Sequence, residues 1–394
     1  MRLGVTMTAA LTAAALLAGT AAAQTANPRW TPAALDAAVA RSMAETGAKG
    51  LAVAVVEDGK PVFVRSYGAR NAKGEPLETD TIMYGASLTK AAFAYMVMEL
   101  VEEGVIGLDT SIAQYLPQPL PSYPDPQERY APWPTLEGDE RWRAITPRIL
   151  LTHSAGFNNF SWDEPDEKLR IHFQPGARYA YSGDGFILLQ FVLERGLGLD
   201  VGREMQRRVF EPLGMTDTSL IWRPEFARNL ADGWDEKGAV EPHDERSKVR
   251  AAGSMDTTIA DMAKFAAGYV RGERLSPRAR AELTRPQLAI DSATQFPSLR
   301  PPLPPEQRRA DLAAGLGVVA FKGPQGPGFF KGGHNDTTGN TWVCVERGRR
   351  CVVILANDVR AERAFPRLVR LVLGETGTPW AWEYGPREML PRGR

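Results

Sequence analysis

Apolar and polar positions follow strand and helix periodicities that change along the chain. After Thr31-Pro32, an apolar residue recurs at every fourth position, which predicts an amphipathic helix beginning at Pro32. The next stretch, GLAVAVVEDGKPVFVRSYG, contains two strand-like runs on either side of Asp58-Gly59. A turn dipeptide of this kind between two β-branched runs is typical of an antiparallel hairpin. The N-terminal part of the chain is therefore expected to supply a helix and two paired strands.

The last third of the chain returns to strand-like runs after a middle part whose pattern is mostly helical. These runs are GLGVVAF, GPGFFKGGHN, TWVCVE and CVVILAND, and a helix is expected to follow over about 361–373. Strands at both ends indicate an α+β fold, in which an antiparallel sheet formed from both chain ends is flanked by helices and a helical subdomain is inserted. We expect one domain over 24–394, with the sheet part at about 30–86 and 310–375 and the mainly helical part at about 87–309.

A proline-rich stretch over residues 117–134 interrupts the helical middle part. It carries Tyr123, Tyr130 and Trp133. A long loop with aromatic side chains is consistent with a lid over a pocket. It is equally consistent with a surface loop packed on its own side chains. The pattern leaves both interpretations open.

The first 23 residues have the features of an export signal. Arg2 is followed by an apolar stretch to about Leu17, and three alanines precede Gln24. A transmembrane anchor is the alternative, but an alanine-rich stretch this short rarely spans a bilayer, and the small residues favour cleavage after Ala23. We therefore expect a periplasmic or secreted protein with no stable membrane anchor after cleavage.

Charge and composition narrow the classes of partner. The chain has 47 basic and 47 acidic residues, a balance that gives no indication of a nucleic-acid surface. Hydrophobic residues make up 43% of the chain and the charges are dispersed, which excludes a disordered protein. Because no CxxC, HExxH or paired-histidine spacing is present, we expect neither a metal site nor a cofactor.

The two cysteines lie in TWVCVERGRRCVVILAND, which reads as two strands joined by a hairpin turn. If the turn centres on Arg347 and Gly348, then Cys344 and Cys351 face each other across the strands, close enough to form a disulfide. An exported protein would permit this bond. Two separate buried thiols are the alternative.

The stretch YGASLTKAAFAYMVMELVEEG places two reactive side chains at the start of a buried helix. From Leu88 to Val101 the residues are apolar almost all round, so the helix is expected to have neighbours on every side. Ser87 falls in the first turn, and Lys90 lies three residues later on the same face, where its amine can reach the hydroxyl. Burial and the helix N-terminus both disfavour a cation and lower the pKa of Lys90. A neutral amine beside a hydroxyl predicts a serine nucleophile with a lysine base.

Three segments in this order resemble the motifs of a known superfamily. They are Ser87-Leu-Thr-Lys90, then PGARYAYSGDGFILLQ with Tyr181, then GGHNDTTGN with His334, and ITPRILLTHSAGF and FEPLGMTDTSL accompany them. Over about 50–358 the chain resembles the serine β-lactamases and penicillin-binding proteins, most closely the class C-like branch with family VIII carboxylesterases and D-amino-acid-handling peptidases. A Ser-His-Asp triad is disfavoured because the chain has no GxSxG elbow, and His153-Ser154 matches a structural turn of the superfamily.

The resemblance implies a β-lactamase/transpeptidase-like fold, an acyl-enzyme on Ser87 and roles for further residues. Tyr181 would share the proton network of Ser87 and return a proton to the leaving group. His334 stands where many relatives carry lysine and would orient the substrate. The oxyanion would be held by backbone N–H groups of Ser87 and of a residue after His334, for which Thr337 is expected.

Two positions depart from the family pattern. Gly183 stands where many relatives have Asn, and Asp336 stands where Gly is usual. The missing amide and the added carboxylate disfavour β-lactam and D-alanyl peptide chemistry, so we expect an exported serine hydrolase of the carboxylesterase type acting on small esters. The alternatives are a β-lactamase or D-alanyl peptidase or carboxypeptidase, whose small-molecule substrate would be an amide, and a non-catalytic binder of peptidoglycan fragments.

Overall fold

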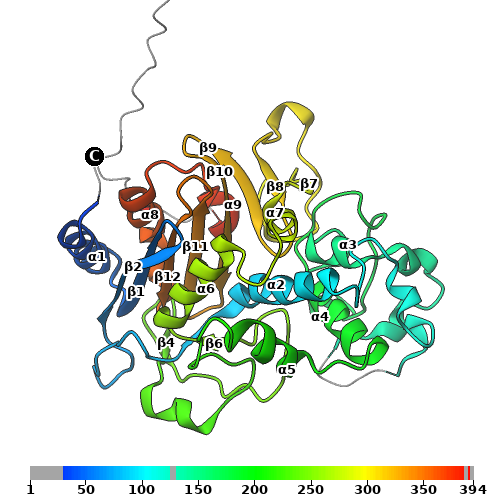
Figure 1. Cartoon of the computed structure of the whole chain (residues 1–394), viewed down its shortest axis with the longest axis horizontal. Coiled ribbons are helices and arrows are strands. Elements are labelled where there is room, and N and C mark those ends of the chain that lie inside the picture. Colours follow the sequence, from blue (N-terminus) through cyan, green and yellow to red (C-terminus); the bar gives the residue numbers. More distant parts are fainter. Residues whose placement is uncertain (1–29, 125–129, 386–388, 391–394) are drawn as a thin grey trace, which may run out of the picture.

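The computed structural model describes residues 30–124, 130–385 and 389–390, so the expected export signal lies outside the described residues. An eight-stranded sheet has the order β2-β1-β12-β11-β10-β9-β8-β7, with every neighbouring pair antiparallel. Its strands are β1 (Gly50–Glu57), β2 (Lys60–Gly68), β7 (Leu288–Ala289), β8 (Leu312–Ala314), β9 (Val319–Gly323), β10 (Gly326–His334), β11 (Gly339–Val345) and β12 (Arg350–Ala356). The predicted α+β fold with one antiparallel sheet from both chain ends is confirmed, because β1 pairs directly with β12 (Figure 1).

Helices cover both faces of this sheet (Figure 1). They are α1 (Pro32–Thr46), α2 (Thr89–Glu102), α3 (Pro147–Leu151), α4 (Gly183–Phe191), α5 (Val201–Met205), α6 (Ile259–Arg271), α7 (Pro277–Thr284), α8 (Phe365–Leu373) and α9 (Trp380–Tyr384). Alternate residues of β1 point to opposite faces. Val56 belongs to the core that contains α2 and α6, whereas Val55 belongs to the core of α1 and α8. The continuous apolar run of β1 follows from this burial on both faces.

Local sequence signals set the ends of several elements. The side chain of Thr31 accepts a hydrogen bond from the N–H of Ala34 and caps α1, as the sequence predicts. Asp58 and Gly59 have φ values of 49° and 71°, the left-handed pair that a two-residue hairpin turn requires. Cys344 and Cys351 are directly paired across β11 and β12, with Cα atoms 4.1 Å apart, and form the expected disulfide.

The helical part of the chain is not wholly separate from the sheet. Helix α6 lies within the range expected to be mainly helical, yet it packs on β1, β2 and β12. One short ladder joins the two parts, because β3 (Met83–Tyr84) pairs with β6 (Asp256–Thr257). A second ladder lies within the helical part, where β4 (Gly233–Trp234) pairs with β5 (Val240–Glu241). No helix in the described part of the chain is long and apolar enough to cross a bilayer.

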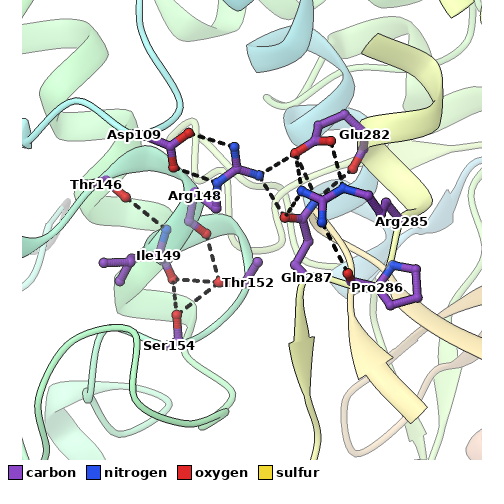
Figure 2. Close-up of polar contacts among 10 residues, drawn as sticks. All are labelled: Asp109, Thr146, Arg148, Ile149, Thr152, Ser154, Glu282, Arg285, Pro286 and Gln287. Atoms are coloured by element: carbon purple, nitrogen blue, oxygen red, sulfur yellow. Dashed lines mark hydrogen bonds and ion pairs between the residues drawn. The ribbon is translucent and has the colours of Figure 1, made fainter. Parts of the chain in front are cut away.

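An arginine links α3 to the region of α7 and β7 (Figure 2). The guanidinium of Arg148 donates to both carboxylate oxygens of Asp109, at 2.6 and 2.7 Å. Its remaining nitrogen donates to Glu282 on α7 and to the side-chain oxygen of Gln287, the latter at 2.7 Å. Arg285 donates to the same two acceptors. This network fixes the helical region against the edge of the sheet.

The described part of the proline-rich stretch packs on the helical region. The rings of Tyr123, Tyr130 and Trp133 surround Phe191 of α4, with centroid distances of 4.9, 5.0 and 5.5 Å. None of these three rings lines the cavity at Ser87 described below. The structure therefore favours a packed surface loop over a lid.

Candidate active site

Ser87 lies where the chain passes from strand β3 into the helical turn η1 (Ala86–Leu88) and then into α2. Ala86 has a φ of 47°, an unfavourable conformation for a residue with a Cβ. Such backbone outliers cluster at functional sites, because the surrounding structure must hold them. The N–H of Ser87 is in the first helical turn, where no intrahelical acceptor is available.

The structure brings Ser87, Lys90 and Tyr181 together. Nζ of Lys90 lies 3.1 Å from Oγ of Ser87, and the Tyr181 hydroxyl donates to the same oxygen at 2.8 Å. Lys90 Nζ also donates to the backbone carbonyl of Ala252 at 2.5 Å, which fixes the amine in place. Oγ of Ser87 is therefore shared between a possible base and a proton donor.

The surroundings of Lys90 favour a neutral amine. Lys90 is fully buried, and its nearest rings are Tyr181 at 4.9 Å and Phe186 at 5.7 Å. Burial, and then the positive charge of Lys331, hold the pKa of Lys90 well below its usual value. Burial also raises the pKa of Tyr181, so its phenol keeps its proton at neutral pH. A free amine can accept the Ser87 proton while the phenol donates.

His153 supports this arrangement from behind. Its ring stacks on Tyr181 with centroids 4.2 Å apart, and its Nδ1 accepts the N–H of Ser182 at 3.0 Å. Burial lowers the pKa of His153 well below its usual value, so the ring is neutral. It positions Tyr181, in agreement with the structural role expected for the LLTHSAG segment.

A second lysine, Lys331, lies in the same site and was not among the residues expected there. Its Nζ lies 3.5 Å from the Tyr181 hydroxyl and donates to the carbonyl of Gly332 at 2.7 Å. The expectation that His334 stands in the position of a family lysine needs correction, because Lys331 is the lysine beside Tyr181. The lysine followed by two glycines in FFKGGHND was the available signal. His334 lines the same cavity farther along β10.

Strand β10 approaches Ser87 closely at Gly333. A Cβ on Gly333 would lie 3.0 Å from the backbone nitrogen of Ser87 and 2.9 Å from the carbonyl oxygen of Gly85, so a side chain would force the strand away. Thr337, the expected oxyanion donor, is elsewhere: its N–H donates to Asn335 Oδ1 at 3.1 Å, and its side chain lies against Gly233. That expectation is wrong because the chain has already turned away from Ser87 at Asn335.

A cavity of about 430 Å³ opens above Ser87. Its aromatic walls come from Tyr84, Phe160, Trp162, Tyr181 and Phe296. Polar and charged groups reach it from Asn159, Arg250, Gln295, Lys331, His334 and Glu383. Its size is in the range of small-molecule sites. Within the described ranges, no group of three or more His, Cys, Asp and Glu side chains is placed to hold a metal ion.

The two departures from the family pattern do not lie in this cavity. Gly183 is buried, and a Cβ on it would lie 2.4 Å from the Phe160 ring. Asp336 is exposed and lies beyond the cavity lining. The expectation that Asp336 places a carboxylate near the substrate is therefore wrong. A carboxamide is also present in the cavity after all, from Asn159, whose Oδ1 accepts the N–H of Gly183 at 3.1 Å.

Known proteins resemble this chain in sequence and in fold. The chain is 26% identical over 314 residues to the D-alanyl-D-alanine-carboxypeptidase/endopeptidase AmpH of Escherichia coli K12, covering 75% of this chain and 76% of that protein. It is 28% identical over 220 residues to the esterase EstB of Burkholderia gladioli, covering 51% and 55%. The octameric penicillin-binding protein homologue from Pyrococcus abyssi shares the fold, with a TM-score of 0.68 and 19% identity over 88% of this chain and 78% of that one. A family model described as Beta-lactamase matches residues 35–374, and the chain therefore belongs to the Beta-lactamase family, whose members are serine hydrolases.

Proposed function

We propose that this protein is an exported serine hydrolase that forms an acyl-enzyme on Ser87 and acts on small carboxylic esters. The observation that carries the proposal is the sharing of Ser87 Oγ between Lys90 and Tyr181 at the floor of a cavity. A binding protein would not need a buried lysine with a lowered pKa beside a serine, because burying that amine costs free energy and adds nothing to ligand binding.

In the proposed acylation, Ser87 Oγ attacks the ester carbonyl while the neutral amine of Lys90 takes its proton. The Tyr181 phenol then donates a proton to the leaving alcohol oxygen, and the proton held by Lys90 replaces it. The ammonium of Lys331, 3.5 Å from the phenol oxygen, favours negative charge on that oxygen during the transfer. Water hydrolyses the acyl-enzyme in the second half of the cycle, which releases the acid and restores Ser87.

The oxyanion is proposed to accept from the backbone N–H groups of Ser87 and His334. The carbonyl of Gly332 accepts the Lys331 side chain. Alternate residues of a strand direct their backbone groups to the same edge. The N–H of His334 therefore points to the same edge of β10 as the carbonyl of Gly332. The close approach of Gly333 brings that part of β10 against Ser87.

Esters are the favoured substrates because the cavity is walled largely by aromatic rings, which provide apolar contact for an acyl or alcohol group. The relative EstB is an esterase. A D-alanyl peptide is the second candidate, since Asn159 and Arg250 in the cavity lining could bind an amide and a carboxylate. The relative AmpH acts as a D-alanyl-D-alanine carboxypeptidase and endopeptidase.

The test compares substrates on the purified protein with residues 1–23 removed. We expect kcat/KM for p-nitrophenyl acetate or butyrate to exceed that for a chromogenic cephalosporin, and a fluorophosphonate to label Ser87 but not the Ser87→Ala variant. Release of D-alanine from a D-alanyl-D-alanine peptide at a higher kcat/KM than ester hydrolysis would select the second candidate. Binding of a peptidoglycan fragment without any covalent labelling would instead establish a non-catalytic protein.

A further inference from the structure

Helix α9 is the last helix in the described part of the chain (Figure 1). It carries Glu383, whose buried carboxylate lines the cavity. Its side chain is 4% exposed and has no part in the acylation steps described above. We propose that Glu383 is a positioning residue of the active site, whose carboxylate keeps Lys331 in the ammonium form beside Tyr181. This inference rests on the proposed function and adds a residue from the far end of the chain to it.

Gly332 is close to both charged groups. Lys331 Nζ donates to the Gly332 carbonyl at 2.7 Å, and a Cβ on Gly332 would lie 1.9 Å from Oε1 of Glu383. The carboxylate thus occupies the space that any larger residue at 332 would need. The absence of a side chain at this position permits the approach of an acidic group to the lysine end of the cavity.

Hydrogen bonds hold Glu383 and its neighbours on α9 in place. The carboxamide of Gln295 hydrogen-bonds to its carboxylate, and Tyr179 in turn donates to Gln295 Oε1 at 3.0 Å. The backbone N–H of Gln295 donates to the carbonyl of Trp382 at 2.9 Å. The Tyr384 hydroxyl donates to the carbonyl of Asn340 at 2.8 Å. A carboxylate fixed in this way acts as a permanent feature of the cavity wall.

Burial explains why the Lys331 ammonium needs a neighbour of opposite charge. Lys331 is buried beside the phenol of Tyr181, so burial opposes its charge. Burial lowers the pKa of Lys331 to about 8, and the negative charge of Glu383 opposes this decrease. Glu383 itself faces Lys331, His334, Tyr179 and Glu362, and burial raises its pKa above the usual value.

The pH dependence of acylation follows from these pKa shifts. Above the pKa of Glu383 and below about pH 8, both the carboxylate and the Lys331 ammonium are charged. Loss of the carboxylate removes the interaction that raises the pKa of Lys331, so Lys331 would lose its proton at a lower pH. Glu383 also raises the pKa of Lys90. In its absence, the acid midpoint of the pH–rate profile for acylation should therefore also move to a lower pH.

The experiment measures the rate of Ser87 labelling by a fluorophosphonate against pH in the wild type and in Glu383→Gln. We expect the alkaline midpoint, near pH 8 in the wild type, to fall by about one pH unit in the variant, as removal of a nearby opposite charge predicts. Glu99→Gln removes another buried carboxylate, at the other end of α2, and should leave the midpoint unchanged. If Glu383→Gln does not fold, Gly332→Ala displaces the carboxylate and should shift the midpoint in the same direction.

A second readout does not depend on activity. In the Ser87→Ala background, ¹⁵N-lysine NMR gives the pKa of Lys331, whose signal is assigned by its loss in Lys331→Met. A lower pKa in Glu383→Gln supports the proposal even if no substrate is turned over, whereas absence of labelling at any pH would refute only the proposed function. An unchanged Lys331 pKa in folded Glu383→Gln, with labelling intact, would overturn the role of Glu383 alone.

Discussion

Phe160 packs against the backbone of Gly183, and a Cβ on Gly183 would lie 2.4 Å from Cε1 and 2.5 Å from Cζ of its ring. The same ring stacks on Trp162, with centroids 4.1 Å apart, and both rings line the cavity above Ser87. The glycine at this position therefore makes room for an aromatic wall of the active site. The N–H of Gly183 donates a hydrogen bond to the side-chain oxygen of Asn159.

This contact predicts that Gly183→Asn does not convert the protein toward β-lactam hydrolysis. The larger side chain would displace Phe160, so we expect lower ester kcat/KM and a loss of stability of about 1–3 kcal/mol, the usual cost of overpacking. The double variant Gly183→Asn/Phe160→Ala should recover part of the stability. Thermal unfolding and kcat/KM for an ester and a cephalosporin measure both effects, and a gain in cephalosporin hydrolysis by the single variant would contradict the prediction.

The contacts at Ser87 predict the effects of removing each member of the proposed catalytic unit. Ser87→Ala should abolish ester turnover and covalent labelling, and Lys90→Met should lower the acylation rate by about 10²–10⁴-fold, the usual contribution of a general base. Tyr181→Phe should also lower it, and the double variant should lose less than the product of the single effects, because the residues act as a unit.

Tyr95→Phe is the matched control for Tyr181→Phe. Tyr95 is equally buried, but its hydroxyl donates to the backbone carbonyl of Glu273, away from Ser87. Its loss should leave the acylation rate unchanged. Stopped-flow acylation with p-nitrophenyl butyrate and circular dichroism of each variant give the measurement. Turnover retained by folded Ser87→Ala would show that the nucleophile is a different residue.

The Arg148 network of Figure 2 predicts a stability effect that is distant from the cavity. Arg148→Met leaves Asp109 and Glu282 without this partner, so the free energy of unfolding should fall by about 1–3 kcal/mol. Arg143→Met is the control, because the Arg143 side chain is 50% exposed. Among the described residues, the exposed Glu140 is the one acidic side chain with which it forms an ion pair. Its effect should stay below about 1 kcal/mol.

The same network gives this stability difference a pH dependence. Hydrogen bonds from Arg285 first, and then from Arg148, lower the pKa of Glu282 to about 2. A carboxyl group whose pKa is lowered by folding contributes stability above its unfolded pKa and loses it as the pH falls toward the folded value. The difference between wild type and Arg148→Met should therefore shrink between about pH 4 and pH 2. Urea unfolding at several pH values tests this, and a constant difference would contradict it.

The disulfide predicts the chemistry and stability of the oxidised protein. Cys344 and Cys351 are seven residues apart, so the loop that the bond closes is short. Reduction should lower the free energy of unfolding by only about 1–3 kcal/mol. Thiol titration of unfolded, unreduced protein should find no free thiol. Two titratable thiols in material from an oxidising compartment would show that the pair does not bridge in solution.

The sequence by itself determined the local elements and identified the candidate nucleophile. Thr31-Pro32, Asp58-Gly59 and the SxxK segment each specify structure through neighbours a few residues away, and the structure agrees with them. The strand periodicity at both ends also indicated one antiparallel sheet built from the two chain ends, and the structure pairs β1 with β12.

Only the tertiary structure decided which distant side chains complete the site. Asn159 and Glu383 are far from Ser87 in the sequence, and neither spacing nor composition indicates that they share its cavity. The two glycines after Lys331 are a local signal, but the fold is needed to show that its amine approaches Tyr181. Thr337 and Asp336 were misplaced for the converse reason: they follow His334 in sequence, but the turn at Asn335 carries them away from Ser87. The sequence predicts the relative positions of residues within one helix or turn, because local geometry sets them. A cavity is formed by the packing of separate elements, whose contacts exist only after the chain has folded.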